Sequence, residues 1–263
     1  MAELVRIEST GWRRGLGAVL RAELSAWWGT RRWVMQLLIW VLMIDGILLA
    51  VLLGSRGEQG GPGAQELFLL YGVFSGLFVA VGVVIAMQGS VVGERRSGTA
   101  QWVLSGPVSR TSFILAKLLA NSLGFLVLAT LVPGLVAYAF FRWIGGLDVD
   151  ALRFLSGGAI IYLHTWFYLT LTLLTSTIFR HWAPAAGVPF GVLAAQNIVV
   201  SMFPRASGYI PWAIAIQDRG GPAVAAVAMA GGAELNVAAL VITGAASLLF
   251  LVTALAVFQH DEL

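Results

Sequence analysis

The sequence predicts an all-α membrane protein with six transmembrane helices. Three observations lead to this class: 59% of the 263 residues are hydrophobic, only 11% are charged, and the apolar residues gather in six long runs. Soluble domains carry about 25% charged residues, so lipid must cover the apolar surface of this chain. Each run exceeds the roughly 20 residues that a spanning helix needs, and the runs are Trp33–Gly54, Leu67–Val91, Ser112–Phe141, Phe154–Phe179, Ala183–Phe203 and Asn236–Phe258.

A basic amphipathic segment, residues 11–32, precedes the first run. Its apolar side chains recur at helical spacing and arginines flank them; these apolar residues are Leu16, Val19, Leu20, Leu24, Trp27 and Trp28. The pattern predicts a helix that lies in the cytoplasmic membrane interface, and the alternative is a basic anchor that only sets topology. We therefore divide the chain into an N-terminal region, 1–32, and a six-helix transmembrane domain, 33–263.

The loop after the second run holds the densest group of charged and special residues in the chain. It reads Glu94-Arg95-Arg96-Ser97-Gly98-Thr99, followed by Pro107-Val108-Ser109-Arg110 and by Lys117, the only lysine. Charge is scarce elsewhere, so this loop is the place where a soluble partner would bind. Loops with many special residues tend to carry function.

Two later features interrupt the simple pattern of spans. Pro133 lies inside the long third run, which predicts a tilt or a kink there. The segment between the fifth and sixth runs contains two apolar stretches, Ile210–Ile216 and Pro222–Met229, that are too short to cross a bilayer. They predict re-entrant or interfacial helices on the outer side, and the alternative is an apolar loop without structure.

The basic residues predict the orientation of the spans. If the N-terminus is cytoplasmic, eleven of the sixteen basic residues lie inside, namely Arg6, Arg13, Arg14, Arg21, Arg31, Arg32, Arg95, Arg96, Arg110, Lys117 and Arg180. The other five, Arg56, Arg142, Arg153, Arg205 and Arg219, lie outside. Both termini are then cytoplasmic, and the arginine-rich and alanine-rich composition suggests a bacterial plasma membrane.

Few polar residues lie within the runs. Asp45 stands near the middle of the first run, where an acid costs about 2.5–3.5 kcal/mol on insertion scales and is a functional candidate. The alternative is a carboxyl group that only bonds to a neighbouring helix. Tyr168, Thr172 and Asn121 are further candidates for a translocation path, although hydroxyls and amides in spans more commonly join helices. The three histidines are too scattered for a metal site, and we expect none.

The motif after the second run resembles the signature of type-2 ABC exporter permeases. Glu94-Arg95-Arg96-Ser97-Gly98-Thr99, Leu104-Ser105-Gly106-Pro107-Val108-Ser109-Arg110 and Lys117-Leu118 are similar to the pattern E-R-x-x-G-T…L-x-x-P-V-S-R…K. The ending Phe258-Gln259-His260-Asp261-Glu262-Leu263 resembles the aromatic and then charged end of that family. The loop motifs are similar to those of the single-domain permeases of nitrous oxide reductase maturation and of gliding motility.

The resemblance implies a permease subunit that exports a substrate with energy from a separate ATPase. The chain has no G-x-x-x-x-G-K-[ST] loop, so it cannot cradle ATP phosphates itself. The resemblance implies two ATPase subunits that use ATP and Mg, with no cofactor and no nucleic acid bound by this chain. A second permease subunit, identical or related, would complete the pore. A short coupling helix, Glu94–Gly106, would dock on the ATPase through residues Glu94, Arg95, Arg96, Gly98, Thr99, Trp102, Pro107 and Arg110.

Two other classes of function stay open at this point. The first is a membrane scaffold or sensor of the same fold that transports nothing. The second is an intramembrane enzyme, which would need a nucleophile and a base or clustered acids at one depth. The runs contain no G-x-S-x-G or H-E-x-x-H motif and no paired aspartates, so we assign no catalytic residue.

Overall fold

A computed structural model describes residues 11–55, 62–216 and 222–261. Parts of the predicted N-terminal region, of the glycine-rich connections after the first run and before the last run, and of the C-terminal ending lie outside these residues. The described residues form helices and connecting loops without a strand. In order along the chain the helices are α1 (Leu16–Trp28), α2 (Arg32–Gly54), α3 (Ala64–Met87), α4 (Val92–Arg96), α5 (Thr99–Ser105), α6 (Arg110–Phe125), η1 (Leu126–Leu131), α7 (Val132–Ala139), η2 (Phe140–Ile144), α8 (Ala151–Ile178), α9 (Trp182–Met202), α10 (Pro204–Ser207), α11 (Trp212–Ala215), α12 (Val224–Ala230) and α13 (Val237–Gln259).

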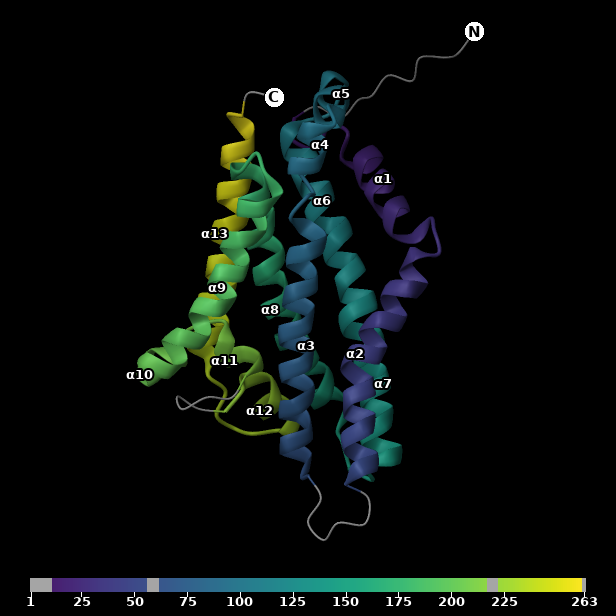
Figure 1. Cartoon of the computed structure of the whole chain (residues 1–263), viewed down its shortest axis with the longest axis vertical. Coiled ribbons are helices and arrows are strands. Elements are labelled where there is room, and N and C mark those ends of the chain that lie inside the picture. The colour runs from purple at the N-terminus through teal and green to yellow at the C-terminus, as the bar shows by residue number, and fades with distance from the viewer. Residues whose placement is uncertain (1–10, 56–61, 217–221, 262–263) are drawn as a thin grey trace.

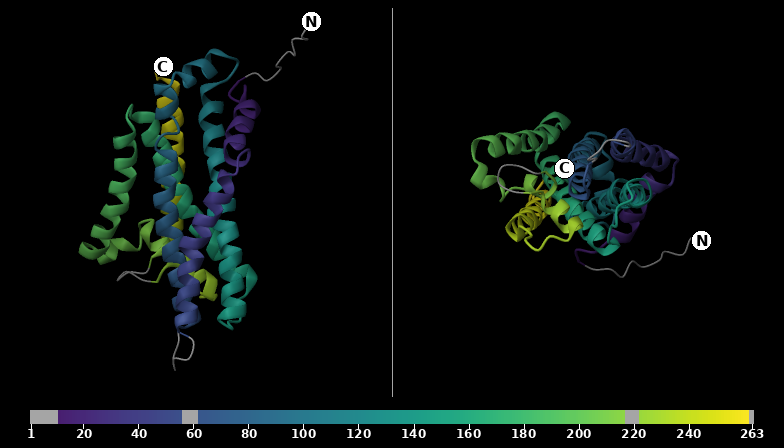
Figure 2. Two further views of the ribbon diagram at one scale, coloured as in Figure 1. Left: turned by 45° about the vertical axis from the view of Figure 1, so that its right-hand side comes forward. Right: turned by 90° about the horizontal axis from the view of Figure 1, so that it is seen from below.

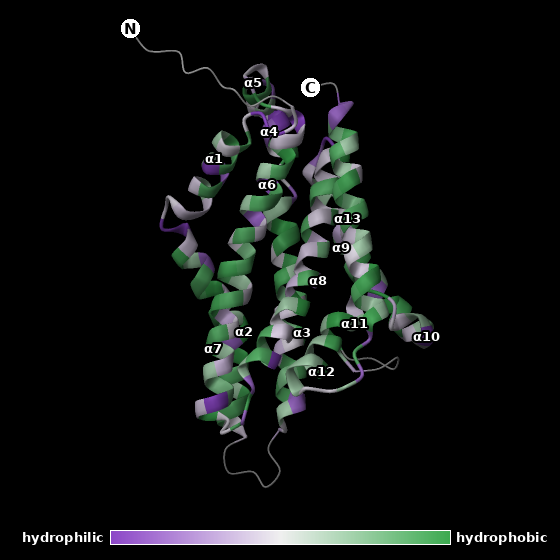
Figure 3. Cartoon of the chain, turned by 180° about the vertical axis from the view of Figure 1, so that it is seen from behind, coloured by the Kyte–Doolittle hydropathy of each residue, from purple (hydrophilic) through white to green (hydrophobic). Residues whose placement is uncertain are grey.

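Six helical segments are long and apolar enough to cross a membrane, which confirms the predicted class. They are Arg32–Gly54, Ala64–Arg96, Arg110–Ile144, Ala151–Ile178, Trp182–Met202 and Val237–Gln259. Each begins within a few residues of its predicted start, and the spans run roughly along the long axis of the bundle, with α3 reaching from its lower end to α4 (Figure 1). Apolar residues cover the middle of the bundle, and hydrophilic residues gather at α4 and at the end of α13 (Figure 3).

Helix α8 is the centre of the bundle. It packs against α3, α9, α12 and α13, and it is the most buried of the six spans, whereas α13 is the least buried. Hydroxyl side chains of α8 bond across to neighbouring helices: Thr175 donates to the carbonyl of Ala185 at 2.7 Å, and Ser176 accepts from the backbone N–H of Val91 at 3.1 Å. These bonds support the interpretation that the α8 hydroxyls join helices.

The third span is not a regular α-helix. Two π-helical segments, η1 and η2, flank α7, and η1 ends directly before Val132 and Pro133. Proline has no N–H to donate to the preceding turn, and a π-turn is a common way to accommodate such a break inside a helix. The predicted irregularity near Pro133 is therefore present as a change of helix type.

Short buried helices fill the side of the bundle opposite α5. All four residues of α11 are buried, as are most of α12, and both helices pack against α3 and α8. Gln196 of α9 fixes this region, because it accepts from the backbone N–H of Trp212 at 2.8 Å and donates to the hydroxyl of Tyr168 at 2.6 Å. That α11 and α12 dip into the bilayer stays a prediction.

Candidate functional site

The loop between α3 and α6 projects from one end of the bundle, together with α1 and the end of α13 (Figures 1 and 2). The sequence predicts one helix over Glu94–Gly106, but the structure has two, α4 and α5. Gly98 separates them with a φ of 77°, a left-handed conformation that favours glycine. The break turns α5 away from the axis of α3.

Lys117 lies at the base of this loop and is almost wholly buried. Its Nζ pairs with Oε1 of Glu23 from α1 at 2.6 Å and with Oε1 of Glu94 from α4. The lysine side chain is 3% exposed, and its ammonium also lies 4.8 Å from the centre of the Phe113 ring. A buried cation is tolerated only when it is paired, so Lys117 holds α1, α4 and α6 together.

A second set of bonds joins the loop to the end of the chain. Arg95 forms an ion pair with Asp261, and Nη1 of Arg110 donates to the carbonyls of Gln259 and Asp261 at 2.8 and 2.7 Å. The rings of Phe113 and Phe258 stack beneath them, with centroids 5.4 Å apart. The C-terminal end of α13 is therefore attached to both α4 and α6.

Helix α1 has no buried residue of its own, yet it is attached to α6 along its length. Nε1 of Trp27 donates to Oδ1 of Asn121 at 3.2 Å, and the Trp27 ring lies over Gly124, where an added Cβ would meet it at 2.6 Å. At the start of α6, Ser109 and Ser112 both donate to the carbonyl of Trp12. These contacts bind the N-terminal segment to the loop; its position in the membrane interface stays a prediction.

The predicted docking residues thus separate into two groups. Glu94, Arg95 and Arg110 are partly buried and bonded within the chain, so they are not free to supply an ion pair at the rim of a partner. The others are exposed, namely Arg96, Gly98, Thr99, Trp102 and Pro107. Trp102 is 78% exposed, an unusual position for a large aromatic side chain on a short helix outside the bundle.

The four residues predicted for a translocation path do not form one cluster. Tyr168 bonds to Gln196, and Asn121 bonds to Trp27 and to the carbonyl of Lys117. Within the described ranges, none of the four forms a hydrogen bond with another. Asp45 and Thr172 are buried, and neither carboxylate oxygen of Asp45 nor Oγ1 of Thr172 has a hydrogen-bond partner among the described residues. Asp45 therefore faces protein rather than lipid.

Three residues important for these contacts were absent from the predicted site: Glu23, Gln196 and Asp261. Glu23 lies 94 positions from its partner Lys117, and Asp261 lies 166 positions from Arg95. No local pattern connects positions so distant. The sequence offered only a general indication of their importance. Each is a charged or amide residue in or beside an apolar region, and such a residue requires a bonding partner.

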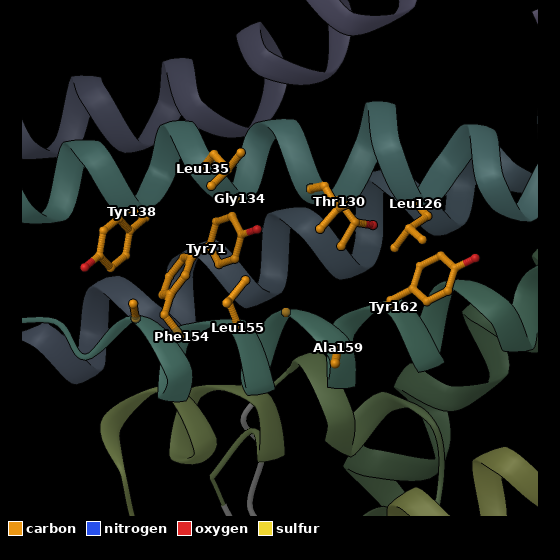
Figure 4. A pocket seen from close by; sticks show the side chains of 13 residues that line it. Tyr71, Leu126, Thr130, Gly134, Leu135, Tyr138, Phe154, Leu155, Ala159 and Tyr162 are labelled. Carbon is orange, nitrogen blue, oxygen red and sulfur yellow. The ribbon is translucent and has the colours of Figure 1, made fainter.

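An apolar cavity of about 360 Å³ lies between the third and fourth spans (Figure 4). Its walls come from α3, η1, α7 and α8, with the rings of Tyr71, Tyr138 and Tyr162 among them. A polar pocket of about 430 Å³ adjoins it at the connection between η2 and α8. None of the predicted path residues lines the apolar cavity.

Comparison with known proteins agrees with the fold and the loop. Residues 30–263 match the family model described as "ABC-2 family transporter protein". The chain is also similar to "Uncharacterized transmembrane protein YxlG" of Bacillus subtilis (strain 168), with 32% identity over 129 residues, 49% of this chain and 49% of that protein. This match spans about half the length of the relative. Because the family model covers all six spans and the charged loop, the chain belongs to the ABC-2 family of transporter membrane proteins.

Proposed function

We propose that this chain is the permease subunit of an ABC exporter, and that α5 is the surface on which a separate ATPase docks. The observation that supports this most directly is the position of Trp102, 78% exposed on a short helix outside the bundle. Exposed aromatic residues that a partner buries are often the energetic centre of an interface. The neighbouring exposed residues Arg96 and Thr99 would form its polar rim.

The partly buried residues of the loop have a different role in this proposal. Lys117 joins α4 to α1 and α6, while Arg95 and Arg110 join the loop to the end of α13. A displacement of α5 by the ATPase would therefore act on three helices rather than on a free loop. Coupling needs such a contiguous set of packed and bonded elements.

The full transporter would contain two permease subunits, identical or related, and two ATPase subunits that bind ATP and Mg. The loop and both termini would face the bacterial cytoplasm, where ATP is available. Family membership supports the association with an ATPase, whereas the number of copies and the outward direction of transport are our proposals.

The test is co-purification with an ABC ATPase subunit that is expressed together with this chain. We expect Trp102→Ala to lower the amount of bound ATPase and the permease-stimulated hydrolysis by about tenfold or more, because truncation of a central interface tryptophan commonly costs 2 kcal/mol or more. The matched control is Trp143→Ala, since Trp143 is 82% exposed at the opposite end of the bundle. Equal ATPase binding by both variants would show that α5 is not the docking surface.

A further inference from the structure

The apolar cavity between the third and fourth spans is open to the side of the bundle. Leu135 of α7 and Leu155 of α8 line it and are 63% and 54% exposed. Figure 4 shows Leu135 and Thr130 on one wall, facing Leu155 and Ala159 on the other. Both walls belong to membrane-spanning segments, so the solvent at this opening is the hydrocarbon of the bilayer.

The cavity is elongated along the membrane normal. On the third span it reaches from Tyr138 to Leu126, about a dozen positions, or about 18 Å at the helical rise of about 1.5 Å per residue. One leaflet contributes about half of a hydrocarbon core that is about 30 Å thick. The cavity therefore has the length of one leaflet, which is the length of one acyl chain.

The polar pocket continues this cavity at its outer end. Tyr138 and Ala151 line both spaces, and the hydroxyl of Tyr138 donates to the carbonyl of Val149 at 3.2 Å. The pocket lies where the third span ends and the fourth begins, beside Trp143, which is 82% exposed. Exposed tryptophan is typical of the membrane–water interface, so the polar pocket lies at the level of lipid headgroups.

The charges of the polar pocket suit a zwitterionic headgroup. Its lining includes two arginines and two aspartates, which balance in number: Arg142, Arg153, Asp148 and Asp150. Arg142 pairs with Asp148 at 2.6 Å. The guanidinium of Arg153, in contrast, lies against Gly231 at the end of α12 and has neither an ion pair nor a hydrogen bond among residues 11–55, 62–216 and 222–261. Its N–H donors are therefore available for a phosphate.

We propose that this composite site holds one phospholipid of the bilayer, with an amine-bearing zwitterionic headgroup of the phosphatidylethanolamine type. One acyl chain fills the apolar cavity, the phosphate binds Arg153, and the ammonium group lies beside Asp150. The lipid comes from the leaflet opposite α5. It would seal a gap between the third and fourth spans that no side chain of the described residues fills.

Small residues create the cavity, and they allow it to be closed by mutation. Gly134, Gly158 and Ala159 lie where larger side chains would fill the space. A Cβ added at Gly158 meets no atom within 4 Å, so Gly158→Leu enters open space. Gly244 in α13 is equally free of contacts and is the matched control position.

The first test uses the full chain in vesicles that contain phosphatidylethanolamine with a photoactivatable group on an acyl chain. We expect labelled peptides from η1–α7 and from the first half of α8, and about tenfold less label there in Gly158→Leu but not in Gly244→Leu. Unchanged labelling in Gly158→Leu would overturn the proposal. If that variant does not fold, Ala159→Phe also fills the cavity, and it should lower the labelling by the same factor.

The second test concerns the headgroup. Native mass spectrometry of the purified chain should show one retained phosphatidylethanolamine, and Arg153→Gln should lower its occupancy by about tenfold, since 1.4 kcal/mol corresponds to this factor. The control variant is Arg205→Gln, at an exposed arginine of α10. It should leave the occupancy of phosphatidylethanolamine unchanged. Equal retention of phosphatidylglycerol, or a chain-to-chain cross-link from position 158 in place of lipid labelling, would contradict the assignment.

Discussion

At the scale of single residues, Lys117 shows how one buried charge organises a surface. Its ammonium has two carboxylate partners, Glu23 and Glu94, and these side chains are themselves only 20% and 30% exposed. Removal of both acids would leave a buried cation without compensation. Removal of all three charges would leave a neutral contact without a buried ion, and such replacements are often tolerated.

Removal of the two acids and removal of all three charges should therefore change the free energy of unfolding by different amounts. We expect the double variant Glu23→Gln and Glu94→Gln to lower the free energy of unfolding by about 3–5 kcal/mol. Adding Lys117→Met should recover most of that loss. Thermal denaturation of the purified protein in detergent measures both effects. The control is Asp148→Asn in the exposed Arg142 pair, which should leave the denaturation midpoint nearly unchanged, because solvent screens such a pair. A triple variant as unstable as the double variant would contradict this explanation.

Asp45 is the second residue whose position requires a reason. It is 1% exposed, and its carboxylate oxygens have no hydrogen-bond partner among the described residues. A carboxyl group that joins two helices would show such a bond, so simple packing does not account for this acid. A buried acid within a span is costly to retain, which supports our prediction that Asp45 serves transport.

The corresponding experiment is Asp45→Asn, which keeps shape and hydrogen bonding but removes the ionisable group. We expect the variant to assemble with its ATPase and to hydrolyse ATP normally, while substrate export falls by about tenfold or more. Thr243→Val, at another buried and unpaired polar side chain, is the control and should export normally. Normal export by the Asn variant at every pH would contradict the prediction that Asp45 serves transport.

At the scale of elements, the spans were predictable and their connections were not. Hydropathy located each of the six helices because lipid forces every backbone polar group of a span to bond internally, and this depends only on local sequence. The motif at Glu94–Arg110 lies at the end of the bundle to which α1 and the end of α13 are also bonded; that an ATPase docks there stays a prediction. The split into α4 and α5 follows from Gly98, but the sequence allowed a single helix there.

The sequence could not predict which residues of the loop are bonded within the chain and which are exposed, because this depends on partners that are distant in the sequence. Arg95 and Arg96 are adjacent and chemically identical, yet one pairs with Asp261 and the other is exposed. Only the arrangement of α13 beside α4 distinguishes them. The lipid-sized cavity was also beyond prediction, since it arises from small residues of two spans that lie side by side.

At the scale of the whole molecule, the contacts described for the loop bring both ends of the described chain to one side of the bundle. The end of α13 is bonded to α4 and α6, and α1 is bonded to the same elements. Both ends of the described chain therefore lie on the side of α5, as an even number of spans demands. Helix α7, which precedes η2 and the connection to α8, lies toward the opposite end of the bundle (Figure 1).

The chain contains no cysteine, so single introduced cysteines report which side faces the cytoplasm. We expect Ser97→Cys and His181→Cys to react with an impermeant thiol reagent only after permeabilisation of the cells. Asp148→Cys and Glu234→Cys should react from outside, because all four positions are exposed and the excess of arginine on the α5 side retains it in the cytoplasm. The opposite labelling pattern would place α5 outside, where no ATPase could reach Trp102. It would contradict the coupling proposal but not the lipid site, whose position relative to the bilayer is the same in either orientation.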